Sequence, residues 1–280
     1  MCTTCGCSDA AGVLVRRAAA GRRAAAEQGE RQFDYRRLAQ HATHEEAGPE
    51  ERPQPAAGGT VPVEQEILAK NSMLAERNRD GFGQRHILAL NLVSSPGSGK
   101  TTLLERTIRD LGHELPIAVI GGDQATANDM QRIAATGCKA VQINTGTGCH
   151  LDADMVARGL RELAPSSGSI VMIENVGNLV CPALFDLGER AKVALLSVTE
   201  GEDKPLKYPH MFRAARLLLI TKTDLLPYLD FDIDRCIACA RQVNRDIEVI
   251  RLSAKQGDGL NLWYDWLRTE NVRAGAGAAA

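Results

Sequence analysis

The sequence predicts an α/β protein built on a mostly parallel sheet flanked by helices. Apolar runs of strand length alternate with helix-length amphipathic stretches from residue 87 onward, the pattern of repeated βαβ units. The runs are continuous Val, Ile and Leu, as in strands that are buried on both faces. Hydrophobic residues make up 44% and charged residues 24% of the 280 residues, which are ordinary values for a globular chain.

The chain divides into four predicted segments. Residues 1–7 hold a cysteine cluster that is expected to bind metal. Residues 8–62 are predicted to be a flexible linker, because large aliphatic side chains are few and residues 48–55 are rich in Pro. Its Arg pairs have acids nearby, which favours solvated faces of transient helix. Residues 63–270 form the main domain, and residues 271–280 form a disordered tail.

The elements of the main domain are predicted in a regular order. A helical pattern over 63–79 ends at the Asp80-Gly81 pair, ahead of the first strand. A final helix over 259–268 carries Trp263 and Trp266, whose spacing places both on one apolar face against the sheet. The strands are predicted at residues 87–93, 117–120, 140–143, 170–173, 193–198, 217–220 and 247–252.

Composition argues against several classes of partner. Lys and Arg total 33 against 35 Asp and Glu, and the net charge of −2 offers no large positive field for nucleic acid or anionic lipid. The sequence shows no signal-peptide core and no apolar run of about 18 residues, so we expect a cytoplasmic protein without a membrane span. The eight cysteines cluster in short pairs and beside a histidine, which favours metal ligation over disulfide bonding.

Residues 94–102, directly after the first strand, fit a P-loop. Small residues let successive backbone N–H groups turn toward phosphates, a lysine reaches the β and γ oxygens, and a hydroxyl, here that of Thr101, holds Mg²⁺. The following helix adds its positive end to this anion site. Ser94 stands where the generic pattern has its first glycine. The predicted phosphate-binding residues are Gly97, Ser98, Gly99, Lys100, Thr101 and Thr102.

The second half of the nucleotide site is expected at the ends of neighbouring strands. Asp123 follows one predicted strand and Glu174 ends another, and Gly177 follows three residues after Glu174. We interpret Glu174 and Gly177 as a switch in which the carboxylate holds Mg²⁺ through water and the glycine amide senses the γ-phosphate. Lys100, Asp123 and Glu174 are therefore the predicted catalytic residues.

Two later strand ends predict a guanine site. An aspartate accepts hydrogen bonds from N1–H and N2–H of guanine, whereas adenine has an acceptor at N1, so Asp224 favours guanine. Thr221 replaces the asparagine of the N-K-x-D pattern that reads guanine in small GTPases. The predicted base-binding residues are Lys222, Asp224, Ser253, Ala254 and Lys255.

Two groups of residues are predicted to bind transition metals. Cys2, Cys5 and Cys7, with the Cys2 amine after removal of Met1, supply three sulfurs and a nitrogen on a short peptide, a set that suits square-planar Ni²⁺.

The second group is Cys149, His150 and Cys181, which leave one coordination position open for water or a partner's ligand. Cys181 lies shortly after the predicted switch, so metal affinity is expected to depend on nucleotide state. Cys138, Cys236 and Cys239 are interpreted as packing thiols.

Taken together, these motifs resemble the HypB family of hydrogenase nickel-incorporation GTPases, which belong to the SIMIBI class of P-loop proteins. The resemblance covers the first seven residues and residues 63–268, but not the segment between them, which lacks a histidine-rich stretch for nickel storage. The matching motifs are CTTCGC at the terminus, SSPGSGKTT at 94–102, GDQ at 122–124, NTGTGCHLDA at 144–153, ENVGNLVCPA at 174–183 and DLLPYLDFD at 224–232.

The resemblance implies GTP-dependent nickel delivery during [NiFe] hydrogenase maturation. It implies a homodimer, with a HypA-type nickel chaperone and the hydrogenase large-subunit precursor as partners. It also implies Zn²⁺ or Ni²⁺ at Cys149, His150 and Cys181, and a high-affinity nickel site at the terminus. The sequence shows no obvious glutamine or arginine finger, so we expect slow intrinsic hydrolysis.

Two other functions fit parts of the sequence. One is an ATP-dependent kinase that uses the same lysine and Mg²⁺ for phosphoryl transfer to a small substrate. The other is a metal buffer with a vestigial nucleotide site. Competition between ATP and GTP distinguishes the first, and the effect of Lys100→Ala on nickel release distinguishes the second.

Overall fold

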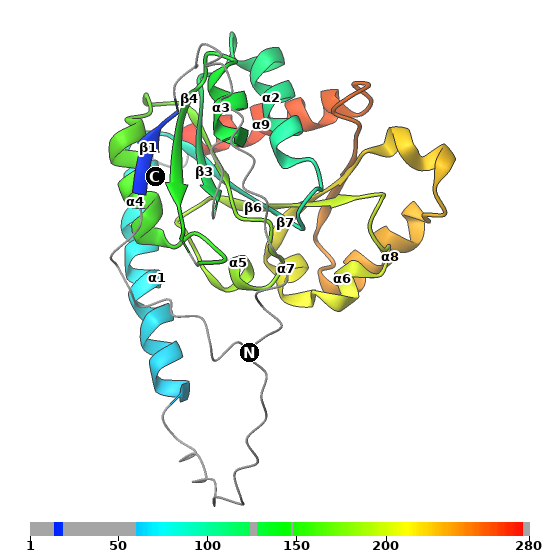
Figure 1. Cartoon of the computed structure of the whole chain (residues 1–280), viewed down its shortest axis with the longest axis horizontal. Coiled ribbons are helices and arrows are strands. Elements are labelled where there is room, and N and C mark those ends of the chain that lie inside the picture. The colour runs from blue at the N-terminus through cyan, green and yellow to red at the C-terminus, as the bar shows by residue number, and fades with distance from the viewer. Residues whose placement is uncertain (1–13, 19–59, 124–127, 147, 277–280) are drawn as a thin grey trace, which may run out of the picture.

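One sheet organises the part of the chain that the structure, a computed structural model, describes: residues 14–18, 60–123, 128–146 and 148–276. The strand order is β1-β4-β3-β5-β2-β6-β7-β8 (Figure 1). Every neighbouring pair is parallel except β1 with β4. The strands are β1 (Leu14–Arg17), β2 (Leu88–Ser94), β3 (Ile117–Asp123), β4 (Lys139–Asn144), β5 (Ile170–Glu174), β6 (Ala191–Ser197), β7 (Ala215–Thr221) and β8 (Glu248–Arg251). The predicted fold class is confirmed.

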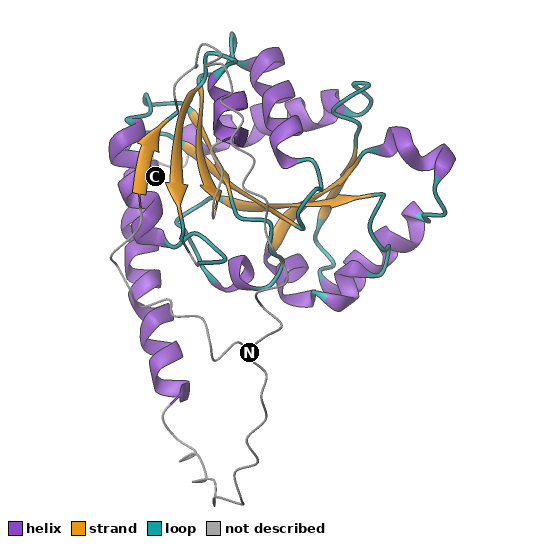
Figure 2. Cartoon of the chain, viewed as in Figure 1, coloured by secondary structure: helices purple, strands orange, loops and turns teal. Residues whose placement is uncertain are grey.

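Helices cover both faces of the sheet (Figure 2). One face packs against α2, α3 and α9, and the other packs against α1 and α4 at one end and α7 and α8 at the other. The helices are α1 (Thr60–Gln84), α2 (Lys100–Leu111), α3 (Asn128–Ala134), α4 (Ala153–Leu163), α5 (Cys181–Leu184), α6 (Lys204–Lys207), α7 (Pro209–Ala214), α8 (Ile233–Val243) and α9 (Leu260–Ala276), with a 3₁₀ helix at Thr223–Tyr228. No helix in these described ranges is long and apolar enough to cross a membrane.

The order of the strands places the functional loops together. β5 lies between β2 and β3, with Glu174 opposite Leu92 on one side and Gly121 on the other. The carboxyl ends of the three strands therefore meet at one edge of the sheet, where ligands bind in open α/β folds.

The predicted core positions are confirmed. Trp263 is fully buried, and its indole N–H donates to Thr107 Oγ1 at 3.0 Å, so its one polar group is satisfied. Trp266 stacks on it at 5.6 Å between ring centroids. Cys236 and Cys239 are buried on α8, as expected for packing thiols.

The third packing thiol, Cys138, is half-buried and donates to the backbone oxygen of Ile117. Burial raises the pKa of this thiol to about 12, so it stays protonated near neutral pH.

Part of the predicted linker is a strand rather than transient helix. Leu14–Arg17 pairs antiparallel with β4, and Val15 packs against the buried residues of α4 and the sheet. Arg17 forms an ion pair with Glu162 on α4. The physical reason is that β4 would otherwise present an open edge of backbone donors and acceptors, which this short segment satisfies. The linker residues 19–59 lie outside the described residues.

Two helices also extend beyond their predicted ends. Helix α1 continues through the predicted Asp80-Gly81 stop to Gln84, because Phe82 is buried in the core beneath it. Helix α9 continues to Ala276, so residues 271–276 of the predicted tail are helical. Buried Glu270 holds this part of α9 through ion pairs with three arginines, which are Arg190, Arg216 and Arg273.

Candidate nucleotide and metal site

A cleft of about 570 Å³ opens at the carboxyl ends of β2, β3 and β5, a volume suited to a small ligand. It brings together all six predicted phosphate-binding residues, 97–102, the other predicted catalytic and switch residues Asp123, Glu174 and Gly177, and Lys222 of the predicted base site. Asp129, Arg132 and Gln142 also line it, although no motif in the sequence marked them.

The loop between β2 and α2 has the backbone of a phosphate cradle. Gly97 and Gly99 adopt φ angles of +75° and +97°, a region that disfavours side chains. Helix α2 begins at Lys100, so its first N–H groups face the cleft. Positive helix ends and inward N–H groups together favour an anion.

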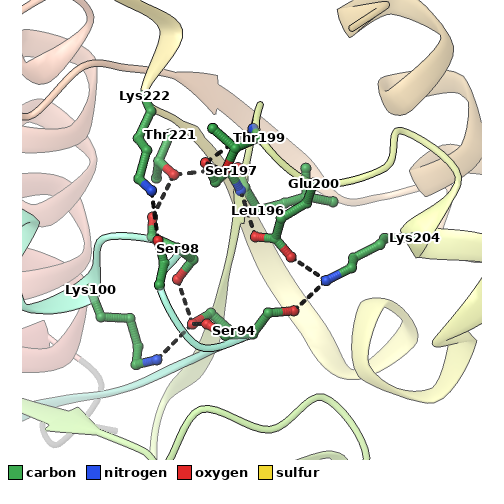
Figure 3. A network of polar contacts seen from close by, with 12 residues as sticks. Ser94, Ser98, Lys100, Leu196, Ser197, Thr199, Glu200, Lys204, Thr221 and Lys222 are labelled. Atoms are coloured by element: carbon green, nitrogen blue, oxygen red, sulfur yellow. Dashed lines mark hydrogen bonds and ion pairs between the residues drawn. The ribbon is translucent and has the colours of Figure 1, made fainter. Parts of the chain in front are cut away.

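Ser94, at the departure from the generic motif, is the centre of the loop's side-chain contacts (Figure 3). Its Oγ accepts from Ser98 Oγ and from Lys100 Nζ, both at 2.6 Å. Lys100 is only 8% exposed, and this burial lowers the pKa of its ammonium group. A phosphate oxygen would offer Lys100 a stronger, charged partner than the serine hydroxyl.

Glu174 and Thr101 form the predicted Mg²⁺ end of the cleft. Thr101 Oγ1 donates to Glu174 Oε1 at 2.7 Å, and the buried Oε2 atom has no hydrogen-bond partner. Burial raises the pKa of Glu174 to about 7. An orphaned carboxylate oxygen beside a hydroxyl suits a hard divalent cation and its waters. Asp123 lines the same cleft at the end of β3.

Gly177 lies directly against the P-loop. A Cβ atom at this position would stand 3.0 Å from three atoms of Pro96, so a larger residue would push the two loops apart. The close approach places the backbone of residue 177 at the cleft wall, where its amide can meet a terminal phosphate.

A second cavity of about 230 Å³ adjoins the first and is lined by four of the five predicted base-binding residues, while the fifth, Ser253, is buried behind it. Ser253 Oγ donates to Asp224 Oδ1 at 2.6 Å, which orients the carboxylate. Lys222 donates to the backbone oxygen of Gly97 at 2.7 Å. The other predicted members that line this cavity are Ala254 and Lys255.

Thr221, at the asparagine position of the N-K-x-D pattern, lines the second cavity and contacts the P-loop. Its hydroxyl donates to the backbone oxygen of Ser98 at 2.7 Å, so the base-binding strand end supports the P-loop (Figure 3).

Lys204, which the sequence did not single out, reaches the P-loop from α6. Its Nζ donates to Ser95 Oγ at 2.6 Å. It also forms an ion pair with the carboxylate of Glu200 (Figure 3). The spacing of four residues marks the pair with Glu200, but no spacing marks the contact with Ser95, which is 109 residues away in the sequence.

Cys149, His150 and Cys181 come together from two loops. Their ligand atoms all lie within 4.8 Å of one another. The two Sγ atoms are 3.0 Å apart, well beyond the roughly 2.05 Å of a disulfide bond. The ring of His150 lies against that of Phe185, with 3.9 Å between centroids and a tilt of 35°. Burial lowers the pKa of its imidazole, which favours the neutral form that binds metals.

The three residues therefore match a soft-metal site with an open fourth position. Cys2, Cys5 and Cys7 lie outside the described residues.

Asparagines connect the switch to the metal loop, a link the sequence did not reveal. Asn175 Oδ1 accepts from the backbone N–H of Leu151 at 3.2 Å and of Val176 at 3.0 Å. Asn178 Nδ2 donates to the backbone oxygen of Cys149 at 3.3 Å. Both asparagines lie in segment 174–181, which also carries Glu174, Gly177 and Cys181.

A buried polar chain continues from Asn175 across the sheet. Its Nδ2 donates to Asn91 Oδ1 at 3.2 Å, and Asn91 Nδ2 donates to Glu189 Oε1 at 3.1 Å. Glu189 pairs with Lys192, which donates to the backbone oxygen of Phe185 at 3.0 Å. The signal for these buried polar contacts in the sequence was Asn91, a single asparagine in an otherwise apolar strand.

Comparison with known proteins agrees with this geometry. The family model of the CobW/HypB/UreG nucleotide-binding domain matches residues 88–251. The chain is 59% identical to the hydrogenase maturation factor HypB of Escherichia coli K12 over 230 residues, which are 82% of this chain and 79% of the relative. It is 61% identical to HypB of Azotobacter chroococcum over 75% of this chain and 69% of the relative.

Solved structures give the same result. HypB from Archaeoglobus fulgidus matches with a TM-score of 0.68 and 40% identity over 72% of this chain and 99% of the other. HypB from Helicobacter pylori in complex with nickel matches with a TM-score of 0.68 and 34% identity over 73% and 96%. Fold, cleft and sequence agree: the chain belongs to the HypB family of hydrogenase maturation factors.

Proposed function

We propose that this protein is a GTP-hydrolysing nickel metallochaperone for [NiFe] hydrogenase maturation. The observation that carries the proposal is that one short segment, residues 174–181, contains the switch acid, the glycine against the P-loop and a metal ligand. A change at the terminal phosphate therefore has a direct path to the sulfur of Cys181.

The cleft residues have distinct roles in the proposed hydrolysis. The backbone of residues 97–102 and the start of α2 hold the phosphates, and Lys100 exchanges its serine partner for phosphate oxygens. Glu174 and Asp123 orient attacking water and the cation shell at the opposite wall. Gly177 contributes its amide to the terminal phosphate.

We assign the cation role to Mg²⁺, held by the Thr101 hydroxyl and, through water, by Glu174. The orphaned Oε2 atom of Glu174 supports this assignment. When bound, Mg²⁺ neutralises charge on the phosphate oxygens as the phosphoryl group leaves. The high pKa of Glu174 means that the carboxyl must lose a proton to accept the cation.

Guanine preference is assigned to Asp224, with the carboxylate oriented by Ser253. Both hydrogen bonds that Asp224 would accept require donors at N1 and at the 2-amino position, which guanine has and adenine lacks. Thr221 supports the P-loop from beneath, a contact that compensates for the missing asparagine side chain.

Nickel is the proposed cargo, and Cys149, His150 and Cys181 are the proposed Zn²⁺ or Ni²⁺ site of the main domain. Two soft thiolates and an imidazole fit either ion, and the open fourth position suits transfer to another ligand. The relative from Helicobacter pylori was solved with nickel. Cys2, Cys5 and Cys7 are proposed as a separate nickel site.

The proposed assembly is a homodimer that receives or passes nickel with a HypA-type chaperone and the hydrogenase large-subunit precursor. In this scheme GTP orders the loops of Asp123, Glu174 and Gly177, shifts Cys181 and promotes dimerisation, and hydrolysis resets the site. Slow intrinsic hydrolysis and a cytoplasmic location remain predictions.

Nucleotide competition tests the nucleotide part of this proposal. Labelled GTP bound to the purified protein is challenged with equal concentrations of GTP, ATP and the matched diphosphates. We expect GTP and GDP to displace the label and ATP to fail. Displacement by ATP as strong as by GTP would support the kinase alternative instead.

Nickel release tests the second part. The protein is loaded with nickel, and release to a chelator is followed with GTP and with GDP for the wild type and for Lys100→Ala. We expect a nucleotide-dependent release rate in the wild type alone. Equal rates in both proteins would support a simple metal buffer.

A further inference from the structure

Helix α1 carries two buried asparagines on the side that faces the domain. Asn71 is 6% exposed and Asn78 is 7% exposed. Residues seven apart lie on the same face of a helix, so the two side chains point in the same direction. Asparagine is a weak helix former, and a buried carboxamide is costly unless it is hydrogen-bonded. Both side chains therefore need hydrogen-bond partners inside the protein.

Each asparagine bridges the same two loops. Asn71 accepts from the backbone N–H of Ala153 at 2.9 Å and donates to the backbone oxygen of Asp186 at 2.7 Å. Asn78 donates to the backbone oxygen of Ala153 at 2.8 Å and to that of Leu187 at 3.0 Å. The two carboxamides thus hold residue 153 against residues 186 and 187 from two sides.

These loops are the two halves of the metal site. Ala153 begins α4, three residues after His150. Asp186 follows Phe185, whose ring lies against that of His150, and the same segment begins with Cys181. The asparagines therefore fix the separation between the loop of Cys149 and His150 and the segment of Cys181.

Helix α1 packs tightly against residues 186–188, in the loop that follows the segment of Cys181. Arg79 forms an ion pair with Asp186, with 2.6 Å between Nη2 and Oδ2. A Cβ atom at Gly188 would stand 2.5 Å from the backbone oxygen of Ala75, so only glycine allows this approach of loop and helix. A close, oriented contact of this kind transmits small displacements instead of absorbing them.

We propose that Asn71 and Asn78 are positioning residues of the metal site: by bridging the two ligand-bearing loops from α1, they set the spacing of Cys149 and His150 from Cys181 and so the affinity for Ni²⁺ and Zn²⁺. This inference rests on the proposed metal-binding function. Neither asparagine touches the ion, and their effect passes through backbone, as partners outside the ligand set often act on metal affinity.

The experiment measures Ni²⁺ and Zn²⁺ affinity by competition with a coloured chelator. All proteins carry Cys2/Cys5/Cys7→Ala, so that only the domain site contributes. Asn71→Ala and Asn78→Ala are compared with Lys70→Ala and Arg77→Ala, which replace exposed neighbours on the same helix. We expect each asparagine variant to lose about tenfold to hundredfold in affinity, with a changed thiolate-to-nickel absorption band, and the controls to match the parent.

GDP affinity and thermal unfolding report on folding in every variant. If an alanine variant fails to fold, Asn71→Ser carries the test, because its shorter hydroxyl adds no charge and can keep at most one of the two hydrogen bonds to Ala153 and Asp186. An intermediate loss of metal affinity is then expected.

Two results would overturn the proposal, and they are distinguishable. If the folded asparagine variants are less stable but bind metal as the controls do, the residues only anchor α1, and the metal site stands. If the parent protein binds metal no better than its Cys181→Ala variant, the proposed metal site itself fails, and the inference fails with it.

Discussion

The phosphate cleft and the metal site lie at the same edge of the sheet but are built in opposite ways. The phosphate cradle comes from consecutive residues of one loop, whose glycines and helix start fix the backbone locally. The candidate metal site takes Cys149 and His150 from one segment and Cys181 from another, and asparagines of segment 174–181 and of α1 hold the two together.

This difference explains which site can respond to the other. A locally determined cradle keeps its shape when its ligand leaves, whereas a site assembled across two loops changes when either loop moves. Segment 174–181 belongs to both candidate sites, so under the proposed function we expect phosphate binding at Glu174 and Gly177 to act on Cys181. Under the proposed function, the cradle is the fixed part and the metal site is the adjustable part.

The largest expected effect is a loss of nucleotide hydrolysis that leaves the metal site unchanged. Lys100→Ala removes the buried cation that faces the phosphates, and we expect hydrolysis to fall by about 10²–10³-fold. Phosphate release measures this effect, with Lys139→Ala, an exposed lysine, as the control. Metal affinity without nucleotide should not change. A loss below about tenfold in hydrolysis would contradict the role of Lys100.

The reverse change should affect only the metal site. Cys181→Ala removes one of two thiolates, and we expect a loss of Ni²⁺ affinity beyond the roughly hundredfold seen for partners outside a ligand set. Chelator competition in the Cys2/Cys5/Cys7→Ala background measures the affinity. Cys138→Ala is the matched control, since that thiol lies at the start of β4 with its own partner. Retained affinity in Cys181→Ala would exclude Cys181 as a ligand.

The pKa of Glu174 makes the cleft sensitive to pH. A carboxyl with a pKa of about 7 must lose its proton to accept Mg²⁺, so apparent Mg²⁺ affinity should rise about tenfold per pH unit below pH 7 and level off above it. Mg²⁺ titration of nucleotide binding between pH 5.5 and 8 measures this slope. Glu174→Gln should abolish the slope; an unchanged slope in that variant would assign it to another group.

The same shift affects stability in the opposite direction. Because the folded-state pKa of Glu174 is raised above the usual 4.5, the folded protein binds more protons than the unfolded chain between pH 4.5 and 7. The contribution of Glu174 to stability therefore falls as the pH rises through this range when nucleotide and Mg²⁺ are absent.

The smallest expected effect concerns the base. Ser253→Ala removes the donor that orients Asp224, at a net cost of about 1 kcal/mol, or about fivefold in GDP affinity. Equilibrium binding of labelled GDP measures it. Metal affinity should match that of the wild type, and a loss of metal affinity instead would place Ser253 in the coupling path.

Local patterns predicted the sheet and the cleft well, because each strand and the P-loop are encoded by neighbouring residues. Ser94 is an instructive case: the motif marked it as a departure, but only the structure shows that its hydroxyl holds Ser98 and Lys100. Cys149 and His150 were paired with Cys181 from their positions near the switch, and the structure brings all three together.

Contacts between side chains and distant backbone groups were not predictable. Asn71 and Asn175 bind backbone N–H groups of a distant loop that have no backbone hydrogen-bond partner in the described part of the chain. No spacing in the sequence predicts which backbone groups these are. The strand at Leu14–Arg17 depends on the open edge of β4, and the length of α9 depends on arginines gathered around Glu270.

One measurement tests most directly whether nucleotide and metal act on the same segment. Ni²⁺ affinity of the Cys2/Cys5/Cys7→Ala protein is determined without nucleotide, with GDP and with a slowly hydrolysed GTP analogue plus Mg²⁺, and analogue affinity is determined with and without Ni²⁺. Coupling through residues 174–181 predicts the same factor in both directions, about 5-fold to 150-fold. Identical Ni²⁺ affinities with the two nucleotides would contradict it.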